Sequence, residues 1–325
     1  MKNTLIGLTM VLSALSACAW DSCACAAYPE RPIVLIVPYA PGGLGTIFGN
    51  LLSEAISPGL GQRVLVDYRP GANGAIGASV VAKAQPDGYT LLMAANGTMT
   101  INPQLYPSMG YDPLTSFTPI AMVATSANIL VVNAASTTKS LQDLLELAKA
   151  KPGRVFFGSS GIGSTVHLSG EMLKREANID AGHVVYKGVG PALLDLMGGQ
   201  IDFVFSDTSA LPYVAAGKLR ALGVTSAERF SVTPDLPTLQ QLGLKDFVVT
   251  SWYAIVAPAG IPQEAVDRLD LEISKALRDP RFQQRLRNAG FQPAADTSPD
   301  YLRNTIRDDF GKWKEFITRN HIKVE

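Results

Sequence analysis

Residues 33–55 read IVLIVPYAPGGLGTIFGNLLSEA, and this stretch decides the fold class of the chain. Five apolar residues, Ile33 to Val37, form a run typical of a strand that is buried on both faces. A turn rich in proline and glycine follows, and apolar side chains then recur on one helical face from Ile47 to Ala55. A buried strand that leads directly into an amphipathic helix indicates a β/α unit of a parallel sheet covered by helices.

The same order recurs along the chain and predicts two doubly wound α/β lobes. The first series continues with strands at 63–68 and 90–95 and a helix at 76–84. After two apolar stretches within 119–133, a second series begins, with helices at 141–150, 165–178 and 191–197 and strands at 155–158, 183–186, 203–206 and 221–225. A strand at 248–257 precedes a helical tail. The second lobe is therefore either a separate C-terminal domain or an insertion in the first. An insertion would give two crossings between the lobes, with a cleft between them.

The amino terminus has the pattern of an export signal. Lys2 precedes an apolar stretch at 5–17 that is too short to cross a bilayer as a helix. The sequence LSAC at 15–18 resembles a lipobox, which predicts a signal of residues 1–17 and lipidation at Cys18. The alternative site ACA at 24–26 predicts cleavage after a signal of residues 1–27. Both alternatives predict a periplasmic protein, in the first case anchored to a membrane by lipid.

Charge and composition argue against several classes of function. Twenty-eight basic residues balance 28 acidic ones, so no basic surface for nucleic acid is expected. No cysteine follows Cys25, which removes disulfides and cysteine nucleophiles from the folded body. The three histidines, His167, His183 and His321, match neither a serine hydrolase motif nor metal-ligand spacing. We therefore expect no catalytic residue, no metal and no cofactor.

Three loops rich in glycine and hydroxyl residues stand where open α/β sheets bind ligands, at the carboxyl ends of strands. They lie at 41–46, 96–98 and 158–165. Glycine lets a backbone approach a ligand closely, and helix N-termini attract anions. One such loop alone also fits a tight turn without a ligand. Three of them, shared between two lobes, predict a cleft for a carboxylate or a phosphate.

Individual side chains near these loops have two interpretations each. Asp207, at the end of a strand, either orients a ligand or caps the next helix. His167 could contact a ligand, although a surface or capping position is favoured. Trp252 and Tyr253 fit core packing as well as ligand contact.

Short motifs along the chain resemble one family. They are YPERPI (28–33), VPYAPGG (37–43), RPGANG (69–74), PDGYT (86–90), YKG (186–188), GGQID (198–202), SWY (251–253) and APAG (257–260). In this order they resemble the periplasmic receptors of tripartite tricarboxylate transporters, of the TctC or Bug type. The resemblance implies a type II-like periplasmic binding protein in which lobe 1 comprises residues 28–128 and 254–325 and lobe 2 residues 129–253. It further implies a monomer that closes on a small organic acid and delivers it to the membrane subunits of a transporter.

The loops and the resemblance together predict the residues that bind the ligand: Tyr39, Pro41, Gly42, Gly43, Thr46, Asn96, Gly97, Thr98, Ser160, Gly161, Ser164, Thr165, Tyr186, Ser206 and Asp207. The family usually carries an aspartate and an Ala-Arg pair in its first helix, where this chain has Thr46 and Gly49-Asn50. A neutral Thr46 predicts an organic acid, such as a dicarboxylate or an aromatic carboxylate, in preference to an amino acid. Two other functions remain open: a ligand sensor for a membrane kinase and an exported hydrolase.

Overall fold

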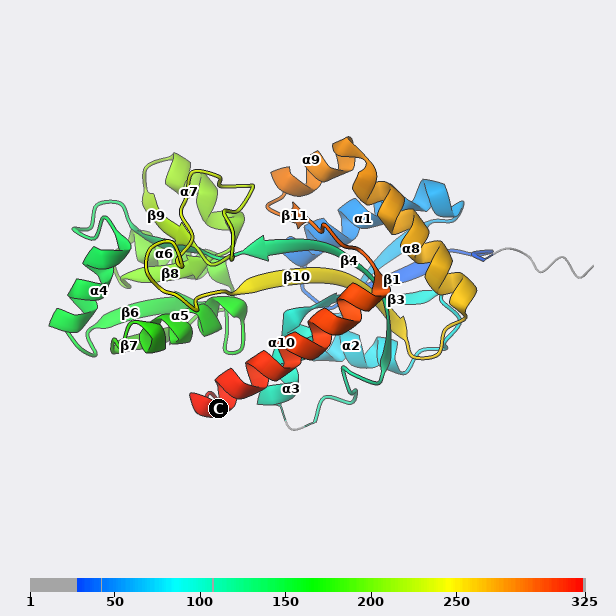
Figure 1. The fold of residues 1–325 in the computed structure, drawn as a ribbon, viewed down its shortest axis with the longest axis horizontal. Helices are drawn as coiled ribbons and strands as arrows, with labels where there is room; N and C mark the ends of the chain where they lie inside the picture. Colours follow the sequence, from blue (N-terminus) through cyan, green and yellow to red (C-terminus); the bar gives the residue numbers. More distant parts are fainter. Residues whose placement is uncertain (1–27, 42, 107, 324–325) are drawn as a thin grey trace, which may run out of the picture.

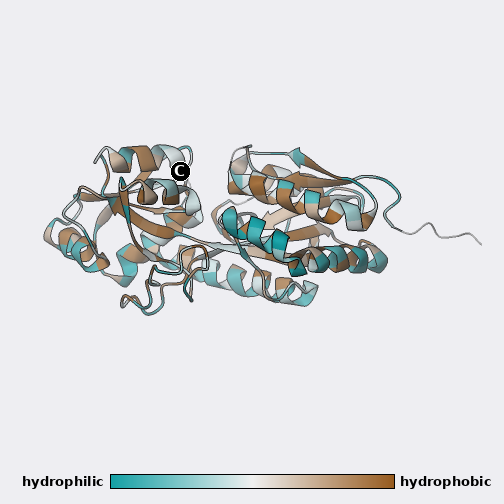
Figure 2. Ribbon diagram, turned by 90° about the horizontal axis from the view of Figure 1, so that it is seen from above, coloured by the Kyte–Doolittle hydropathy of each residue, from teal (hydrophilic) through white to brown (hydrophobic). Residues whose placement is uncertain are grey.

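The computed structural model describes residues 28–323 except 42 and 107. The predicted signal peptide and Cys18 lie outside these residues. Two sheets form the centres of two α/β bodies that lie side by side (Figure 1). Figure 2 shows apolar residues gathered on the strands and on the helix faces that cover them. Among the described residues, none of the helices combines the length and the apolar character that a membrane span requires.

The sheet of lobe 1 has six strands in the order β11-β4-β10-β3-β1-β2. Their bounds are β1 Ile33–Val37, β2 Val64–Tyr68, β3 Thr90–Ala95, β4 Phe117–Ala127, β10 Thr250–Pro258 and β11 Gln292–Pro293. Helices α1 (Leu44–Leu60), α8 (Gln263–Arg278) and α9 (Pro280–Asn288) pack their apolar faces on one side of this sheet. Helices α2 (Ala75–Ala82) and α10 (Pro299–Arg319) cover the other side.

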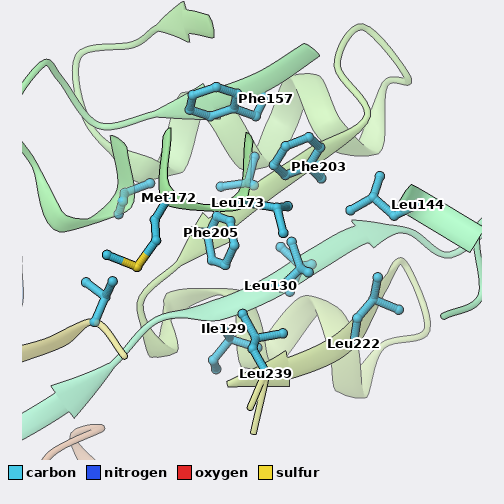
Figure 3. Close-up of a cluster of buried hydrophobic side chains, with 14 of the residues drawn as sticks. Ile129, Leu130, Leu144, Phe157, Met172, Leu173, Phe203, Phe205, Leu222 and Leu239 are labelled. Carbon is cyan, nitrogen blue, oxygen red and sulfur yellow. The ribbon is translucent and has the colours of Figure 1, made fainter. Parts of the chain in front are cut away.

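The sheet of lobe 2 has five strands in the order β7-β6-β8-β5-β9. Their bounds are β5 Ile129–Asn133, β6 Val155–Ser159, β7 Ala181–Val185, β8 Phe203–Ser206 and β9 Leu219–Val224; the helices are α4 Leu141–Ala150, α5 Thr165–Glu176, α6 Val189–Met197 and α7 Leu211–Ala215. Figure 3 shows the core that fixes this lobe, in which Phe157, Phe203 and Phe205 meet Leu130 and Leu173. Helix α4 begins at a capping box, because Ser140 and Asp143 each accept the other's backbone N–H.

The two crossings between the lobes lie side by side. The chain passes from β4 to β5 at Asn128 and returns through residues 225–249 to β10. The N–H of Asn128 donates to the hydroxyl of Thr225 at 2.9 Å, and the N–H of Thr225 donates to the carbonyl of Asn128 at 2.9 Å. The lobes are therefore joined by two hydrogen-bonded segments, and the first residues of β10 already pair with β4.

Both sheets are mixed, whereas the strand–helix order predicted a parallel sheet. β1, β2 and β3 are parallel, as are β6, β7 and β8, whereas β10 runs antiparallel to β3 and β4, and β5 runs antiparallel to β8 and β9. The reason is topological: β5 and β10 enter their sheets from the other lobe, so they run against the strands already there. Helix α9, strand β11 and the short π-helical and α-helical turns Gly97–Ile101 and α3 (Asn102–Leu105) were not predicted.

Helix α10 contacts both lobes. Leu302 and Ile306 in its first half belong to the core of lobe 1, whereas Trp313, Phe316 and Ile317 in its second half belong to the core of lobe 2. Figure 1 shows the helix running along both bodies. The apolar stripe of this helix is therefore buried against two cores.

Candidate ligand-binding site

A cavity of about 350 Å³ lies between the lobes. Both lobes line it, and we call it the inner cavity; its lining residues are Tyr39, Gly43, Leu44, Gly45, Asn73, Ala95, Asn96, Gly97, Ser126, Asn128, Ser160, Gly163, Ser164, Thr165, Val166, Gly188, Val189, Asp207, Ser251 and Tyr253. A larger space of about 790 Å³, the outer cavity, shares five of these residues, including Gly188 and Asp207, and adds Lys187. The shared residues make the two spaces neighbours, so a ligand can extend from one into the other.

Three helices point their N-termini at the inner cavity. Helix α1 begins after Gly43, α5 after Ser164 and α6 after Gly188, and these residues and the first residue of each helix line the cavity. The first N–H groups of a helix have no partner within the helix, and its N-terminus carries partial positive charge. Three such ends at one cavity create a site that favours a negatively charged group.

The loop before α5 uses some of its N–H groups internally. The N–H of Gly163 donates to Nδ1 of His167, and the N–H of Gly161 donates to the hydroxyl of Ser159. The N–H groups of Thr165 and Val166 have no partner among the described residues. They lie at the positive end of α5 beside the cavity, so they are the N–H groups of this loop best placed to receive an anion.

Two tyrosines supply hydroxyl groups. Tyr39 and Tyr253 line the inner cavity, and neither hydroxyl is hydrogen-bonded to a described residue. Burial raises the pKa of both hydroxyls, and the nearby carboxylate of Asp207 raises that of Tyr253 further. Both groups therefore stay protonated at neutral pH and can donate a hydrogen bond. Tyr253 is held in place by ring contacts with Phe48 and Phe291, whose centroids lie 5.5 and 5.0 Å from its own.

Asp207 is the one charged side chain among the described residues that line the inner cavity. Its Oδ1 accepts the N–H of Ser209 at 2.9 Å and so caps the short helix Thr208–Ala210. The capping interpretation is thus confirmed, and the same side chain also lines the cavity.

The lobes contact each other around the cavity. The hydroxyl groups of Thr165 in lobe 2 and Ser251 in lobe 1 lie 3.1 Å apart. The N–H of Ser231 donates to the side-chain oxygen of Gln292 at 3.4 Å. Gly163 lies so close to Leu105 of lobe 1 that a Cβ atom at Gly163 would overlap that side chain. These contacts connect the binding loop of lobe 2 directly to lobe 1.

Eight of the predicted residues meet at the inner cavity: Tyr39, Gly43, Asn96, Gly97, Ser160, Ser164, Thr165 and Asp207. Pro41 lines the outer cavity only, and Gly42 lies outside the described residues. Whether any of these side chains contacts a ligand stays a prediction.

The other predicted residues line neither cavity. The hydroxyl of Thr46 donates to the carbonyl of Ala40, and that of Thr98 donates to the carbonyl of Ala95. The hydroxyl of Tyr186 donates to Asp195 at 2.8 Å. Ser206 is fully buried, and Gly161 bonds within its own loop. His167 is 5% exposed, which corrects the expectation of a surface position.

Several residues that line the inner cavity were not predicted: Asn73, Ser126, Asn128, Gly188, Val189 and Ser251. Tyr253, for which the sequence left core packing and ligand contact open, also lines it. Asn73, Gly188, Ser251 and Tyr253 lie in motifs of the family resemblance, which was an available signal. Ser126 and Asn128 lie at the first crossing, where only the fold shows that they face the cavity. Trp252, in contrast, is 3% exposed and donates to Asp309 at 2.8 Å, as core packing requires.

A two-lobed α/β fold with an anion-favouring cavity between the lobes is typical of solute-binding proteins. Comparisons with known proteins agree with this class. The model of the tripartite tricarboxylate transporter family receptor, TctC, matches residues 50–322. Protein BugT of Bordetella pertussis is 34% identical over 92% of this chain and 92% of its own length.

Solved structures give the same result. The chain resembles R. palustris Rpa4515 with adipate (TM-score 0.83, 32% identity, 91% of this chain and 100% of the other). It also resembles MatC from Rhodopseudomonas palustris with bound malate (TM-score 0.78, 29% identity, 89% and 100%) and the periplasmic binding protein BugD (TM-score 0.80, 34% identity, 91% and 100%). The chain belongs to the TctC family of periplasmic receptors, which bind solutes and are not enzymes.

Proposed function

We propose that this receptor captures a small organic carboxylate in the inner cavity and delivers it to the membrane subunits of a tripartite transporter. The observation that carries the proposal is the convergence of the N-termini of α1, α5 and α6 on one cavity. No lysine or arginine is found among the described residues that line it. Recognition of a carboxylate within the inner cavity therefore depends on N–H and hydroxyl donors rather than on an ion pair.

The donors are sufficient for useful affinity. Each hydrogen bond to a charged group contributes about 1.5–3 kcal/mol. Four of them, from the N–H groups of Thr165 and Val166 and the hydroxyls of Tyr39 and Tyr253, support micromolar binding of about −8.2 kcal/mol after the costs of ordering. The adipate and malate of the two structural neighbours are dicarboxylates. For this chain we propose that one carboxylate lies at the helix N-termini and that the rest of the ligand extends toward the outer cavity and Lys187.

Closure between the lobes completes the site. We propose that the predicted lobes, 28–128 with 254–325 and 129–253, move about the two crossings, because each lobe supplies only part of the donors. Export through the predicted signal peptide would place this monomeric receptor beside its membrane partners, with or without a lipid at Cys18.

A thermal-shift panel tests the binding function. The wild-type protein without its first 27 residues is heated with adipate, malate, citrate, benzoate and aspartate, and with adipamide as the uncharged control. A ligand at 100 times its Kd stabilises the folded state by about 2.7 kcal/mol, which raises the Tm visibly. We expect at least one carboxylate to raise it and adipamide to have no effect. A panel without any stabilising carboxylate would overturn the proposal.

Delivery requires a second experiment in cells. Uptake of the radiolabelled carboxylate is compared between cells with the gene, without it and with Thr165→Val. We expect uptake to be lost without the gene and reduced in the variant. Unchanged uptake with a clear loss of binding would instead favour a sensor.

A further inference from the structure

Two histidines, His167 and His183, contact the loop that precedes α5, and neither lines the inner or the outer cavity. Nδ1 of His167 accepts the N–H of Gly163 at 3.2 Å, and the N–H of His167 donates to the hydroxyl of Ser164 at 3.1 Å. Nε2 of His183, on β7, lies 2.7 Å from the hydroxyl of Ser159. Each ring thus holds one end of the loop at 159–164.

The two histidine rings also stack on each other. The centroids of His167 and His183 lie 4.2 Å apart with 23° between the ring planes, and Phe157 stacks on His183 at 4.7 Å. Gly170 on α5 leaves the space that Phe157 fills, because a Cβ atom there would overlap the ring. The ring positions are therefore fixed by packing as well as by hydrogen bonds.

The hydrogen bonds define the state of His167. An Nδ1 that accepts an N–H carries no proton, so the neutral ring has its proton on Nε2. Nε2 lies 4.0 Å from Oε1 of Glu171, whose other oxygen pairs with Lys174 at 2.9 Å. Burial lowers the pKa of His167 to about 3 and that of His183 to about 4, and the charge of Lys174 contributes in both cases. Both rings are consequently neutral at the pH at which most proteins work.

The loop that these rings hold lines the inner cavity and also contacts lobe 1. Gly163 and Ser164 line the inner cavity, and Gly163 also packs against Leu105 of lobe 1. Without the His167 acceptor, the N–H of Gly163 has to find another partner, and the turn into α5 changes direction. The N–H groups of Thr165 and Val166 would turn with it.

We propose that His167 and His183 are positioning residues of the ligand site, which as neutral rings hold Gly163 and Ser159 so that the N-terminus of α5 faces the inner cavity. The inference rests on the proposed function for its consequence in binding. The arrangement of the loop itself can be measured without a ligand.

Matched variants separate positioning from simple packing. His167→Phe keeps a ring in the stack and removes the acceptor. His167→Asn keeps an acceptor near the position of Nδ1 and removes the ring. Ser159→Ala releases the other end of the loop through His183, and His321→Asn in the exposed tail is the control.

The first readout is amide hydrogen exchange of Gly163 in the ligand-free protein, followed by nuclear magnetic resonance. We expect His167→Phe to speed the exchange of this amide at least tenfold relative to amides in β6, and His167→Asn to stay within threefold of wild type. Wild-type ¹⁵N shifts should show an unprotonated Nδ1 at His167. Wild-type exchange at Gly163 in His167→Phe would overturn the proposal, as would a protonated Nδ1.

The second readout is the Kd for adipate and for malate by calorimetry. We expect His167→Phe and Ser159→Ala to weaken binding about tenfold, and His167→Asn and His321→Asn to leave it within threefold. Folded His167→Phe with fast exchange but wild-type affinity would remove the loop from the ligand site. If wild-type protein binds neither acid while Gly163 is protected, the choice of ligand fails and the positioning role stands. If His167→Phe does not fold, Ser159→Ala decides by the same binding criterion.

Discussion

Replacement of Asp207 by asparagine should tighten the binding of carboxylates. Asp207 is the one charged side chain among the described residues that line the inner cavity, and its negative charge repels the carboxylate that the three helix N-termini there favour. Asparagine is as good a helix cap as aspartate, so Asp207→Asn keeps an acceptor for the N–H of Ser209. The variant therefore removes a negative charge with little change in structure.

The size of the cavity sets the magnitude of the repulsion between Asp207 and a bound carboxylate. A volume of 350 Å³ corresponds to a sphere with a radius of about 4.4 Å, so a carboxylate at its centre lies roughly 7 Å from a charge on the wall. At an effective dielectric constant of 20–40, the repulsion at this distance is about 1–2 kcal/mol. The Kd of a carboxylate should fall about 5- to 30-fold in Asp207→Asn.

Calorimetry at low and high salt measures this effect. Asp246→Asn, which removes an exposed carboxylate that lines neither cavity, is the matched control and should leave the Kd unchanged. Weaker binding in Asp207→Asn would refute the reasoning, because it would mean that the ligand uses Asp207 as an acceptor or binds it through an ammonium group.

Three further predictions follow from the site. Thr165→Val removes a hydroxyl that bonds Ser251 across the cleft and should weaken carboxylate binding roughly tenfold by calorimetry; equal affinity would exclude this hydroxyl from the site. Small-angle scattering should show a smaller radius of gyration when ligand saturates the protein, whereas an identical profile with ligand bound would indicate a rigid pocket. Urea unfolding between pH 6.5 and pH 4.5 should reveal acid lability. The pKa of His167 is lowered to about 3 in the folded state, so below pH 6.5 the unfolded chain binds more protons than the folded protein. The free energy of unfolding therefore decreases as the pH falls below 6.5, by up to about 1.4 kcal/mol per pH unit for this ring. His167→Asn should flatten that slope, and a wild-type slope in this variant would contradict the assignment.

Local signals in the sequence were sufficient for most elements of both lobes. Residues 33–37 form a strand and Leu44 begins a helix, as the apolar run and the glycine-rich turn predict. The direction of β10 could not be predicted in the same way, because it depends on the position from which the chain re-enters lobe 1 after lobe 2. The partners of α10 also depend on the final position of the lobes, since one apolar stripe serves two cores.

The site was predictable as a set of loops but not as a set of side chains. Glycine and hydroxyl residues correctly marked the turns at 41–46 and 158–165 that border the cavity. Thr46 and Thr98 lie in or beside such turns, yet their hydroxyls donate to nearby backbone carbonyls, and sequence position does not reveal this orientation. The preference for an organic acid without an amino group was based on Thr46. Because Thr46 lines neither cavity, this preference stays a prediction, and the aspartate arm of the thermal-shift panel tests it.

The most direct test of a carboxylate site between the lobes is the change in backbone amide resonances on titration with the carboxylate that stabilises the protein most. The site predicts saturable shifts on both lobes, largest at Leu44 and Gly45 in lobe 1 and at Thr165, Val166 and Val189 in lobe 2. Saturable shifts confined to one lobe, or largest away from these three helix N-termini, would contradict it.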